Sequence, residues 1–344
     1  MKVLVTGHHG YIGSVLAPLV ADAGHDVTGL DSYLYRGCDL GAPAVWEPAL
    51  ERDVRDVTVH DLSGFDAVIH LAALSNDPIG DLNAGWTYDI NLDGSVELAR
   101  RAREAGVRRF VFASSCSMYG AAPGDALVTE NAPLRPLTAY AESKVRAEEQ
   151  LFALADADFA PVSMRNATAY GASPRLRLDI VLNNLVGWAH TTGSINLQSD
   201  GTSWRPLVHI RDIAAASIAL LEAPEDTISG EAFNIGTAEQ NYRIRDLADV
   251  VRDVMPECEV TFADGVGTDP RSYRVDFGKL ATTFPGLRLE WTAARGAVEL
   301  AEAYRAAGLT KEDFDGDRFV RLRRIRHLLD AGELDDGLRR VSVS

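Results

Sequence analysis

Short apolar runs alternate with amphipathic helical stretches through the first half of the chain. Five runs have the length and residue types of buried strands, and they cover residues 3–6, 27–31, 65–71, 109–113 and 159–164. Apolar residues recur at helical spacing after Gly13, over 86–105 and over 138–155. Strands that alternate with helices favour a parallel sheet covered on both faces. The pattern therefore predicts an α/β fold with a doubly wound parallel sheet.

The pattern is less regular after about residue 170. Helices are expected over 178–190, 210–221 and 243–255, with a strand over 232–235. These elements predict a smaller, mixed α/β region. The tail contains a basic helix with four apolar residues near one face, Phe319, Leu322, Ile325 and Leu329. A membrane or partner-binding role is open for this helix, but docking on its own domain is the preferred interpretation.

A glycine-rich turn joins the first strand to the first helix. Gly7 can form the turn, Gly10 lets the backbone approach a pyrophosphate, and Gly13 lets the helix pack close to the strand. Phosphates would then meet free N–H groups at the helix N-terminus, where the helix dipole favours negative charge. The order strand, turn, helix predicts a dinucleotide-binding site.

Composition and charge narrow the class of protein. The 344 residues are 46% hydrophobic and 24% charged, as in ordinary globular proteins, and the net charge is −16. This acidity disfavours nucleic-acid binding, and an anionic ligand would need a local cluster of arginines. Three scattered cysteines show no metal spacing, no apolar run reaches membrane-spanning length, and the chain enters a strand at once. A cytoplasmic protein with free thiols is expected.

Tyr140 and Lys144 stand four residues apart near the start of a predicted helix, so they share one face. A phenol has an ordinary pKa near ~10 and is a poor base at neutral pH. A nearby ammonium group is expected to stabilise the phenolate and bring this base toward its working range. The strand at 109–113 runs into the serine-rich segment 114–117, which places hydroxyl groups at the carboxyl edge of the sheet. These groups predict a site for proton transfer.

Four motifs in this order resemble the extended short-chain dehydrogenase/reductase family. They are the glycine turn, His-Leu-Ala-Ala at 70–73, the serine-rich strand end before Tyr119-Gly120, and the Tyr140/Lys144 pair. The closer likeness is to the nucleotide-sugar epimerase/dehydratase group, typified by UDP-galactose 4-epimerase, and it extends to about residue 295. It implies a Rossmann domain over 1–172 to which 206–236 return, a sugar-nucleotide domain over 173–205 and 237–315, and a helical tail over 316–344.

The resemblance implies an NAD-dependent enzyme that acts on a nucleotide-diphosphate sugar. The family's catalytic Ser/Thr, Tyr and Lys correspond to Ser115, Tyr140 and Lys144. Family members usually pair through two helices that match 86–105 and 138–155. A homodimer is therefore expected, with no nucleic acid, membrane or metal involved.

The residues implied for the cofactor come from several strand ends. Asp31 ends the second strand and resembles the acid that holds ribose hydroxyls, which favours NAD. Arg36 lies nearby and could meet a 2′-phosphate, which leaves NADP open. Asn91 resembles a helix asparagine that supports the active site. The full set is Gly7, Gly10, Tyr11, Ile12, Gly13, Asp31, Asp53, Val54, Leu71, Ala72, Ala73, Asn91, Tyr140 and Lys144.

The residues implied for the substrate lie mostly in the second half. Arg205 and Arg271 suit a diphosphate, and Arg175 and Arg177 are further candidates. Thr168 replaces an asparagine that contacts the diphosphate in the family. The full set is Ser117, Thr168, Asn184, Leu185, Gln198, Arg205 and Arg271. Gln198 stands where an apolar residue often covers the nucleobase, so the base stays open.

The residues after Ser115 discriminate between the reactions of the group. In 4,6-dehydratases an acidic pair occupies the positions of Cys116 and Ser117, so dehydration is disfavoured. In 3,5-epimerases a cysteine stands where this chain has Ser117, and Cys116 is interpreted as a packing residue. Two reactions remain, epimerisation by transient oxidation at C4 with return of the hydride, and NAD(P)H-dependent reduction of a 4-keto sugar. The complete Ser/Tyr/Lys set argues against a third reading, a non-catalytic dinucleotide sensor.

Overall fold

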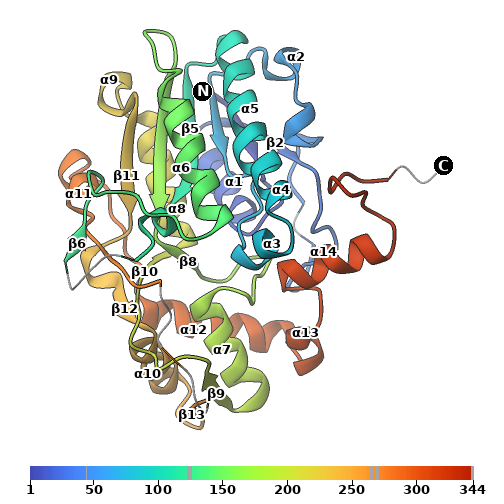
Figure 1. Ribbon diagram of the computed structural model, residues 1–344, viewed down its shortest axis with the longest axis vertical. Coiled ribbons are helices and arrows are strands. Elements are labelled where there is room, and N and C mark those ends of the chain that lie inside the picture. Colours follow the sequence, from blue (N-terminus) through green and yellow to red (C-terminus); the bar gives the residue numbers. More distant parts are fainter. Residues whose placement is uncertain (44, 122–125, 264–266, 268–270, 342–344) are drawn as a thin grey trace.

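A seven-stranded parallel sheet forms the centre of the computed structural model, which describes every residue except 44, 122–125, 264–266, 268–270 and 342–344 (Figure 1). The strand order is β11-β7-β5-β4-β1-β2-β3, so the chain moves outward from β1 in both directions. The predicted doubly wound sheet is confirmed. The strands are β1 (Lys2–Thr6), β2 (Asp26–Asp31), β3 (Ala49–Glu51), β4 (Ala67–His70), β5 (Arg109–Ser115), β7 (Ala160–Asn166) and β11 (Glu231–Ile235).

Helices cover both faces of this sheet, because strand side chains alternate between the faces. Val3 and Val5 of β1 pack in one apolar cluster with helices α1 (Gly13–Asp22) and α8 (Ile210–Glu222). Leu4 points the other way, into a cluster with α5 (Gly94–Glu104) and α6 (Ala139–Phe152). Strands buried on both faces read as the continuous apolar runs seen in the sequence.

The helix expected over 86–105 is formed by three successive segments. They are α4 (Ala84–Thr87), the π-helical η2 (Tyr88–Asp93) and α5. The π-helical turn carries Asn91, whose side chain is completely buried. Such turns are often associated with functional sites, and this one lies directly behind a wall of the cavity described below.

The second half forms a smaller unit at the carboxyl edge of the sheet (Figure 1). It contains a three-stranded sheet of β8 (Thr168–Tyr170), β10 (Trp204–His209) and β12 (Asn241–Arg243). Strand β9 (Ser194–Leu197) pairs with β13 (Glu259–Phe262), and β6 (Leu127–Val128) pairs with β14 (Arg274–Val275). Three helices pack in its core, α7 (Val181–Thr192), α10 (Ile244–Val254) and α12 (Ala293–Ala307).

Helix α12 was absent from the sequence-based expectations. Its buried positions include Ala293, Ala297 and Ala301, whose small side chains give little hydrophobic signal. The remaining short elements are η1 (Val54–Asp56), α2 (Val59–Leu62), α3 (Asp77–Leu82), η3 (Cys116–Tyr119), α9 (Glu225–Ile228), η4 (Ala238–Gln240), α11 (Gly278–Thr283) and α13 (Lys311–Asp315).

The tail helix α14 (Arg321–Asp330) docks on the first half of its own chain, as preferred from the sequence. Ile325 and Leu328 are fully buried in the apolar cluster of α5 and α6. Figure 1 shows this red helix beside the blue and teal N-terminal elements. The far end of the predicted tail, 342–344, lies outside the described residues.

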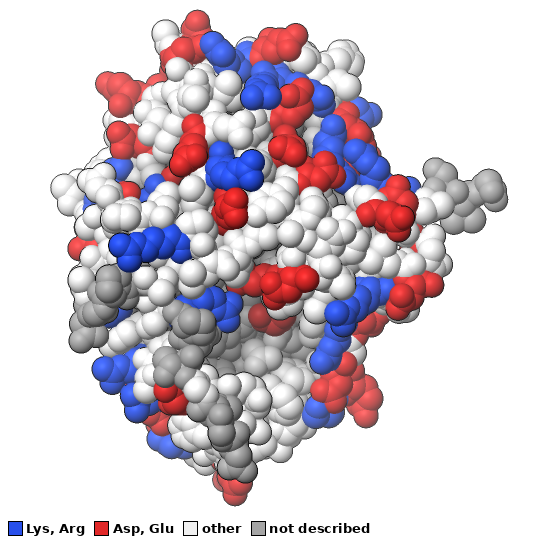
Figure 2. Space-filling model, viewed as in Figure 1, with Lys and Arg blue, Asp and Glu red and all other residues white. Residues whose placement is uncertain are grey.

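Acidic and basic side chains are interspersed over the face shown in Figure 2, with no continuous area of one sign. Charges of both signs also lie side by side where Figure 1 places α14. Within the described part of the chain, no helix has both the length and the apolar character needed to cross a bilayer.

Candidate active site

A cavity of about 310 Å³ opens at the carboxyl edge of the central sheet. Residues at or just after the ends of β1, β2, β4, β5 and β7 line it: Gly7, Asp31, Leu71, Ser115 and Asn166. This is the edge where doubly wound sheets bind ligands. The second half and the tail supply the other walls through Arg177, Ile180, Tyr273 and Arg321.

The glycine turn forms one end of the cavity. Gly7 has a positive φ of 72°, and a Cβ at this position would lie 2.8 Å from the Ala72 backbone nitrogen. A Cβ on Gly13 would overlap the carbonyl oxygen of Gly7. Side chains are therefore excluded at both positions, and α1 begins directly against the turn. A phosphate group can approach this bare backbone closely.

Asp31, the last residue of β2, holds the backbone on either side of the predicted adenosine end of the cofactor site. Its carboxylate accepts hydrogen bonds from the backbone N–H groups of Tyr33 at 2.7 Å and His9 at 3.0 Å. Burial raises the pKa of this carboxyl group. Arg36, the residue that left NADP open, forms an exposed ion pair with Glu51 at 2.7 Å and does not line the cavity.

Among the residues expected at the cofactor, Asn91 is the exception. It does not line the cavity. Its side chain instead accepts a hydrogen bond from the Leu74 N–H at 2.8 Å and donates one to the Leu74 carbonyl at 3.1 Å. Asn91 therefore positions a wall residue. The expected residues that do line the cavity are Gly7, Gly10, Tyr11, Ile12, Gly13, Asp31, Asp53, Val54, Leu71, Ala72, Ala73, Tyr140 and Lys144.

Ser115, Tyr140 and Lys144 all line the same cavity. The Thr138 side chain caps α6 by accepting a hydrogen bond from the Ala141 N–H, so Tyr140 lies in the first helical turn. The Ser115 side chain lies close enough to the Tyr140 hydroxyl to act on the pKa of the phenol. Ser115 also accepts a hydrogen bond from the Ser117 N–H at 3.1 Å, which fixes its side chain at the end of β5.

The electrostatics of the tyrosine–lysine pair differ from the sequence-based expectation. Burial raises the pKa of Tyr140 to about 12, although the nearby Ser115 hydroxyl acts in the opposite direction. Burial lowers the pKa of Lys144 to about 7. The lysine donates to the Ala113 carbonyl at 2.7 Å, and its nitrogen lies 6.0 Å from the centre of the Tyr140 ring. The expected acidification of the phenol by lysine is therefore wrong: the pKa of Tyr140 is raised, because the cost of removing charge from water dominates.

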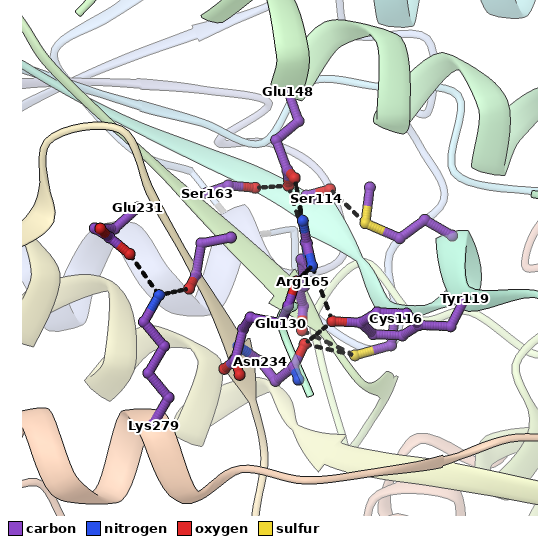
Figure 3. Close-up of polar contacts among 12 residues, drawn as sticks. Ser114, Cys116, Tyr119, Glu130, Glu148, Ser163, Arg165, Glu231, Asn234 and Lys279 are labelled. Atoms are coloured by element: carbon purple, nitrogen blue, oxygen red, sulfur yellow. Dashed lines mark hydrogen bonds and ion pairs between the residues drawn. The ribbon is translucent and has the colours of Figure 1, made fainter. Parts of the chain in front are cut away.

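A buried network behind the cavity fixes the position of α6 (Figure 3). Glu148, one turn after Lys144, pairs with Arg165 of β7 at 2.5 Å and accepts a hydrogen bond from Ser163 at 2.5 Å. Arg165 also donates to the Tyr119 hydroxyl at 3.0 Å. These contacts tie the helix that carries Tyr140 and Lys144 to the strand end beside Ser115.

Two polar side chains in the cavity wall have unused hydrogen-bonding capacity. Asn166 was not predicted, although it directly follows Arg165 and is the register partner of Ser115 across β5 and β7. The Asn166 Oδ1 and the Ser117 Oγ are buried, with no hydrogen-bond partner in the described part of the chain. Both residues line the cavity, so a ligand there can satisfy them.

The predicted substrate residues divide into two groups. Ser117 and Thr168 line the cavity, and so does Arg177, one of the further candidates. Arg271 forms an ion pair at 2.9 Å with Asp77, which lines the cavity. Five predicted substrate residues are outside the lining: Asn184, Leu185, Gln198, Arg205 and Arg271.

The Asn-Asn-Leu segment lies mainly in the packing of the second half. Leu185 belongs to its apolar core, and the Asn184 side chain donates to the Leu178 carbonyl at 2.8 Å. The neighbouring Asn183 is completely buried and donates to the Tyr11 hydroxyl at 3.1 Å, which links α7 to the glycine turn. Gln198 is exposed and donates to the Asn196 carbonyl.

Cys116 is a core residue, as interpreted from the sequence. Its side chain is completely buried and its thiol donates to the Arg165 carbonyl at 3.0 Å. Burial raises the pKa of the thiol, and the residue does not line the cavity. The Cys116 thiol therefore packs in the core and is kept in its neutral form.

Known proteins match both the sequence and the fold. A family model described as "NAD dependent epimerase/dehydratase family" matches residues 3–236. A UDP-glucose 4-epimerase from Corynebacterium glutamicum is 33% identical over 271 residues, which are 74% of this chain and 80% of the relative. Two solved structures are each 25% identical to this chain and cover 89% of it. MoeE5 in complex with UDP-glucuronic acid and NAD superposes with a TM-score of 0.77 over 100% of that chain, and TunA, an NAD-dependent NDP-hexosamine 5,6-dehydratase, with 0.78 over 98%.

Proposed function

This chain belongs to the NAD-dependent epimerase/dehydratase family, and from that premise we propose that it is a nucleotide-sugar 4-epimerase. The observation that carries the proposal is the meeting of Ser115, Tyr140 and Lys144 in one cavity with the glycine turn. It places a proton-transfer group and a hydroxyl donor beside a dinucleotide cradle. The sequence similarity to a UDP-glucose 4-epimerase supports the same reaction.

The cavity suits NAD, the cofactor of the family. The backbone at Gly7 and Gly13 leaves room where side chains would clash, and this bare surface would hold the pyrophosphate. Asp31 would hold the adenosine ribose hydroxyls, and Asp53 and Val54 would contact the adenine. When bound, NAD supplies a cationic ring that accepts and returns a hydride.

The chain's own residues would manage the proton and the reacting oxygen. Tyr140 would act from its phenolate form: it would take the proton of the sugar C4 hydroxyl, become the neutral phenol, and later return that proton. Ser115 would donate a hydrogen bond to the same oxygen as charge develops there. Lys144, with its pKa lowered to about 7, would hold or release a proton within the physiological range beside the phenol.

The residues next to Ser115 favour epimerisation over dehydration. Elimination of water needs an acid and a base at the sugar, and this chain has Cys116 and Ser117 at the corresponding positions. Cys116 is completely buried, and Ser117 carries only a hydroxyl group. Ketone reduction would use the same Ser/Tyr/Lys set and is the competing outcome of the test.

The substrate would be a nucleotide-diphosphate hexose. Ser117, Thr168 and Arg177 line the cavity and would contact the substrate. Arg271, which pairs with Asp77 of the lining, and Arg205, which donates to the Arg271 carbonyl, would reach the diphosphate from the second half. Asn184, Leu185 and Gln198 are outside the lining residues, and their described contacts lie within the second half. Two copies of the chain would pair through the helical segments over 86–105 and 138–155, which correspond mainly to η2, α5 and α6.

The test is turnover of a panel of UDP-, dTDP- and GDP-hexoses by the purified protein, followed by NMR of the products. We expect interconversion of one C4 epimer pair with no net change in NADH absorbance. Consumption of NADH with a 4-keto sugar would support the reductase instead. Binding of NAD without conversion of any sugar would support a non-catalytic role.

A further inference from the structure

We propose that Arg321, in the C-terminal tail, binds the pyrophosphate of the dinucleotide. The family model ends at residue 236, so this contact would belong to the tail and not to the matched region. The proposal rests on the cofactor site of the preceding section and is independent of which sugar is converted.

Arg321 is buried and faces the cavity. The residue is only 4% exposed, and it lines the same cavity as the glycine turn. The guanidinium carbon lies 3.9 Å from the centre of the Tyr35 ring, and Nη2 donates to the Arg175 carbonyl at 3.2 Å. Nη1 is buried without a hydrogen-bond partner among the described residues. An acceptor in the cavity would satisfy this nitrogen.

The buried charges near Arg321 are not balanced. Three arginines come together here, and Arg175 pairs with Asp39 while Arg177 pairs with Asp179 at 2.8 Å. No carboxylate of the described residues lies within ion-pair distance of Arg321. Burial, and to a smaller extent the charge of Arg177, lowers the pKa of Arg321, although Asp179 acts in the opposite direction. A buried cation without a counterion is costly, and an anionic ligand removes that cost.

Arg175 links Arg321 to the glycine turn through two hydrogen bonds. The Arg175 carbonyl accepts its hydrogen bond, and the Arg175 side chain in turn donates from Nε to the His9 carbonyl at 3.2 Å. His9 stands between Gly7 and Gly10 in the glycine turn. Among the parts of a dinucleotide, the pyrophosphate is the one that both the turn and a guanidinium recognise.

The tail is anchored on both sides of the adenosine end of the site. Trp86 Nε1 donates to the Asp336 carbonyl at 2.6 Å, and Arg55 donates to the Gly337 carbonyl at 2.8 Å. Arg340 donates to the Tyr33 carbonyl at 2.8 Å, two residues from Asp31. Closer to Arg321, Ile325 and Leu328 of the same helix are buried in the first half, so the docked tail presents Arg321 in a fixed position, which lowers the entropy lost on binding.

The test compares the affinities of NAD, ADP and adenosine for Arg321→Ala, with Arg326→Ala as the matched control. Arg326 is an exposed arginine of the same helix. For Arg321→Ala, we expect NAD and ADP to bind about tenfold or more weakly and adenosine to bind unchanged, because adenosine lacks the pyrophosphate. Arg326→Ala should bind all three ligands like the wild type.

A purely structural role gives a different result. Equal weakening of NAD, ADP and adenosine by Arg321→Ala, or no weakening of any of them, would overturn the proposal. If the alanine variant does not fold, Arg321→Lys and Arg321→Gln provide the comparison. Lysine should retain ADP affinity and glutamine should lose it, and equal ADP affinities in these two variants would also overturn the proposal. Ligand affinity is measured without sugar turnover, so a failed epimerase assay does not affect the outcome.

Discussion

Lys144 lies one helical turn after Tyr140, yet its ammonium nitrogen donates to the Ala113 carbonyl at 2.7 Å and stays 6.0 Å from the centre of the tyrosine ring. Burial acts on both groups and disfavours the charged form of each. Both groups are therefore shifted toward their neutral forms, the phenol and the free amine. Its titration gives a direct prediction for stability.

Removal of the buried lysine should change how stability depends on pH. The folded-state pKa of Lys144, about 7, is below its ordinary value of 10.5, so the unfolded chain binds more protons between these values. The free energy of unfolding of the wild type should therefore increase as pH rises from 7 toward 10.5, by on the order of 5 kcal/mol from this group. In Lys144→Met this contribution should be absent.

Denaturant unfolding of ligand-free protein at several pH values measures this difference. The gap between the wild type and Lys144→Met should shift steadily in favour of the wild type from pH 7 to pH 10. Parallel pH profiles for the two proteins would show that the lysine titrates normally in the folded state.

Tyr140→Phe should abolish turnover while NAD binding persists. The substitution removes the hydroxyl that accepts the sugar proton and leaves the glycine turn unchanged, so kcat should fall by about 10²–10⁴. Tyr242→Phe, a change of the same chemistry outside the cavity lining, should retain activity. Steady-state kinetics and NAD titration give both readouts. Wild-type kcat in Tyr140→Phe would remove Tyr140 from the mechanism.

Asp31→Ala should weaken NAD more than NADP. The carboxylate would hold the ribose hydroxyls of NAD and repel the 2′-phosphate of NADP, so the ratio of the two dissociation constants should shift toward NADP by about tenfold. Asp31→Asn separates charge from shape, because it keeps one acceptor for the N–H groups of His9 and Tyr33. Equal losses for both dinucleotides in both variants would mean that Asp31 holds the loop and does not select the cofactor.

The buried Glu148–Arg165 pair should contribute strongly to stability and to the position of α6. Glu148→Ala leaves the guanidinium buried without its partner and should cost about 3–5 kcal/mol of unfolding free energy. Asp249→Ala breaks the exposed Asp249–Arg252 pair and should cost less than about 1 kcal/mol. Chemical denaturation compares the two. A similar small loss in both variants would contradict the role assigned to the buried network.

Much of the first half could be predicted because its signals are local. The apolar strands end in Gly7, Asp31 and Ser115, and parallel strand ends must meet at one edge of the sheet. The turn and the Tyr140/Lys144 spacing likewise need only a short stretch of chain. Local patterns of this kind predicted both the sheet and the residues that meet in the cavity.

The remaining features depend on tertiary structure. Whether Asn183 or Asn184 faces inward is decided by the exact phase of α7, and Arg321 reaches the cavity only because Ile325 and Leu328 dock the tail on the first half. The direction of the Tyr140 pKa shift also depended on burial, which the sequence did not supply. These are the places where packing overrides the local pattern.

The most direct test of the proposed mechanism uses a hexose from the substrate panel with deuterium at C4. Oxidation and return of the same hydride within one site predicts that the C4 epimer keeps its deuterium, with no exchange into solvent or added NADH. Loss of the label to water, or product formation only with stoichiometric oxidation of added NADH, would contradict the account.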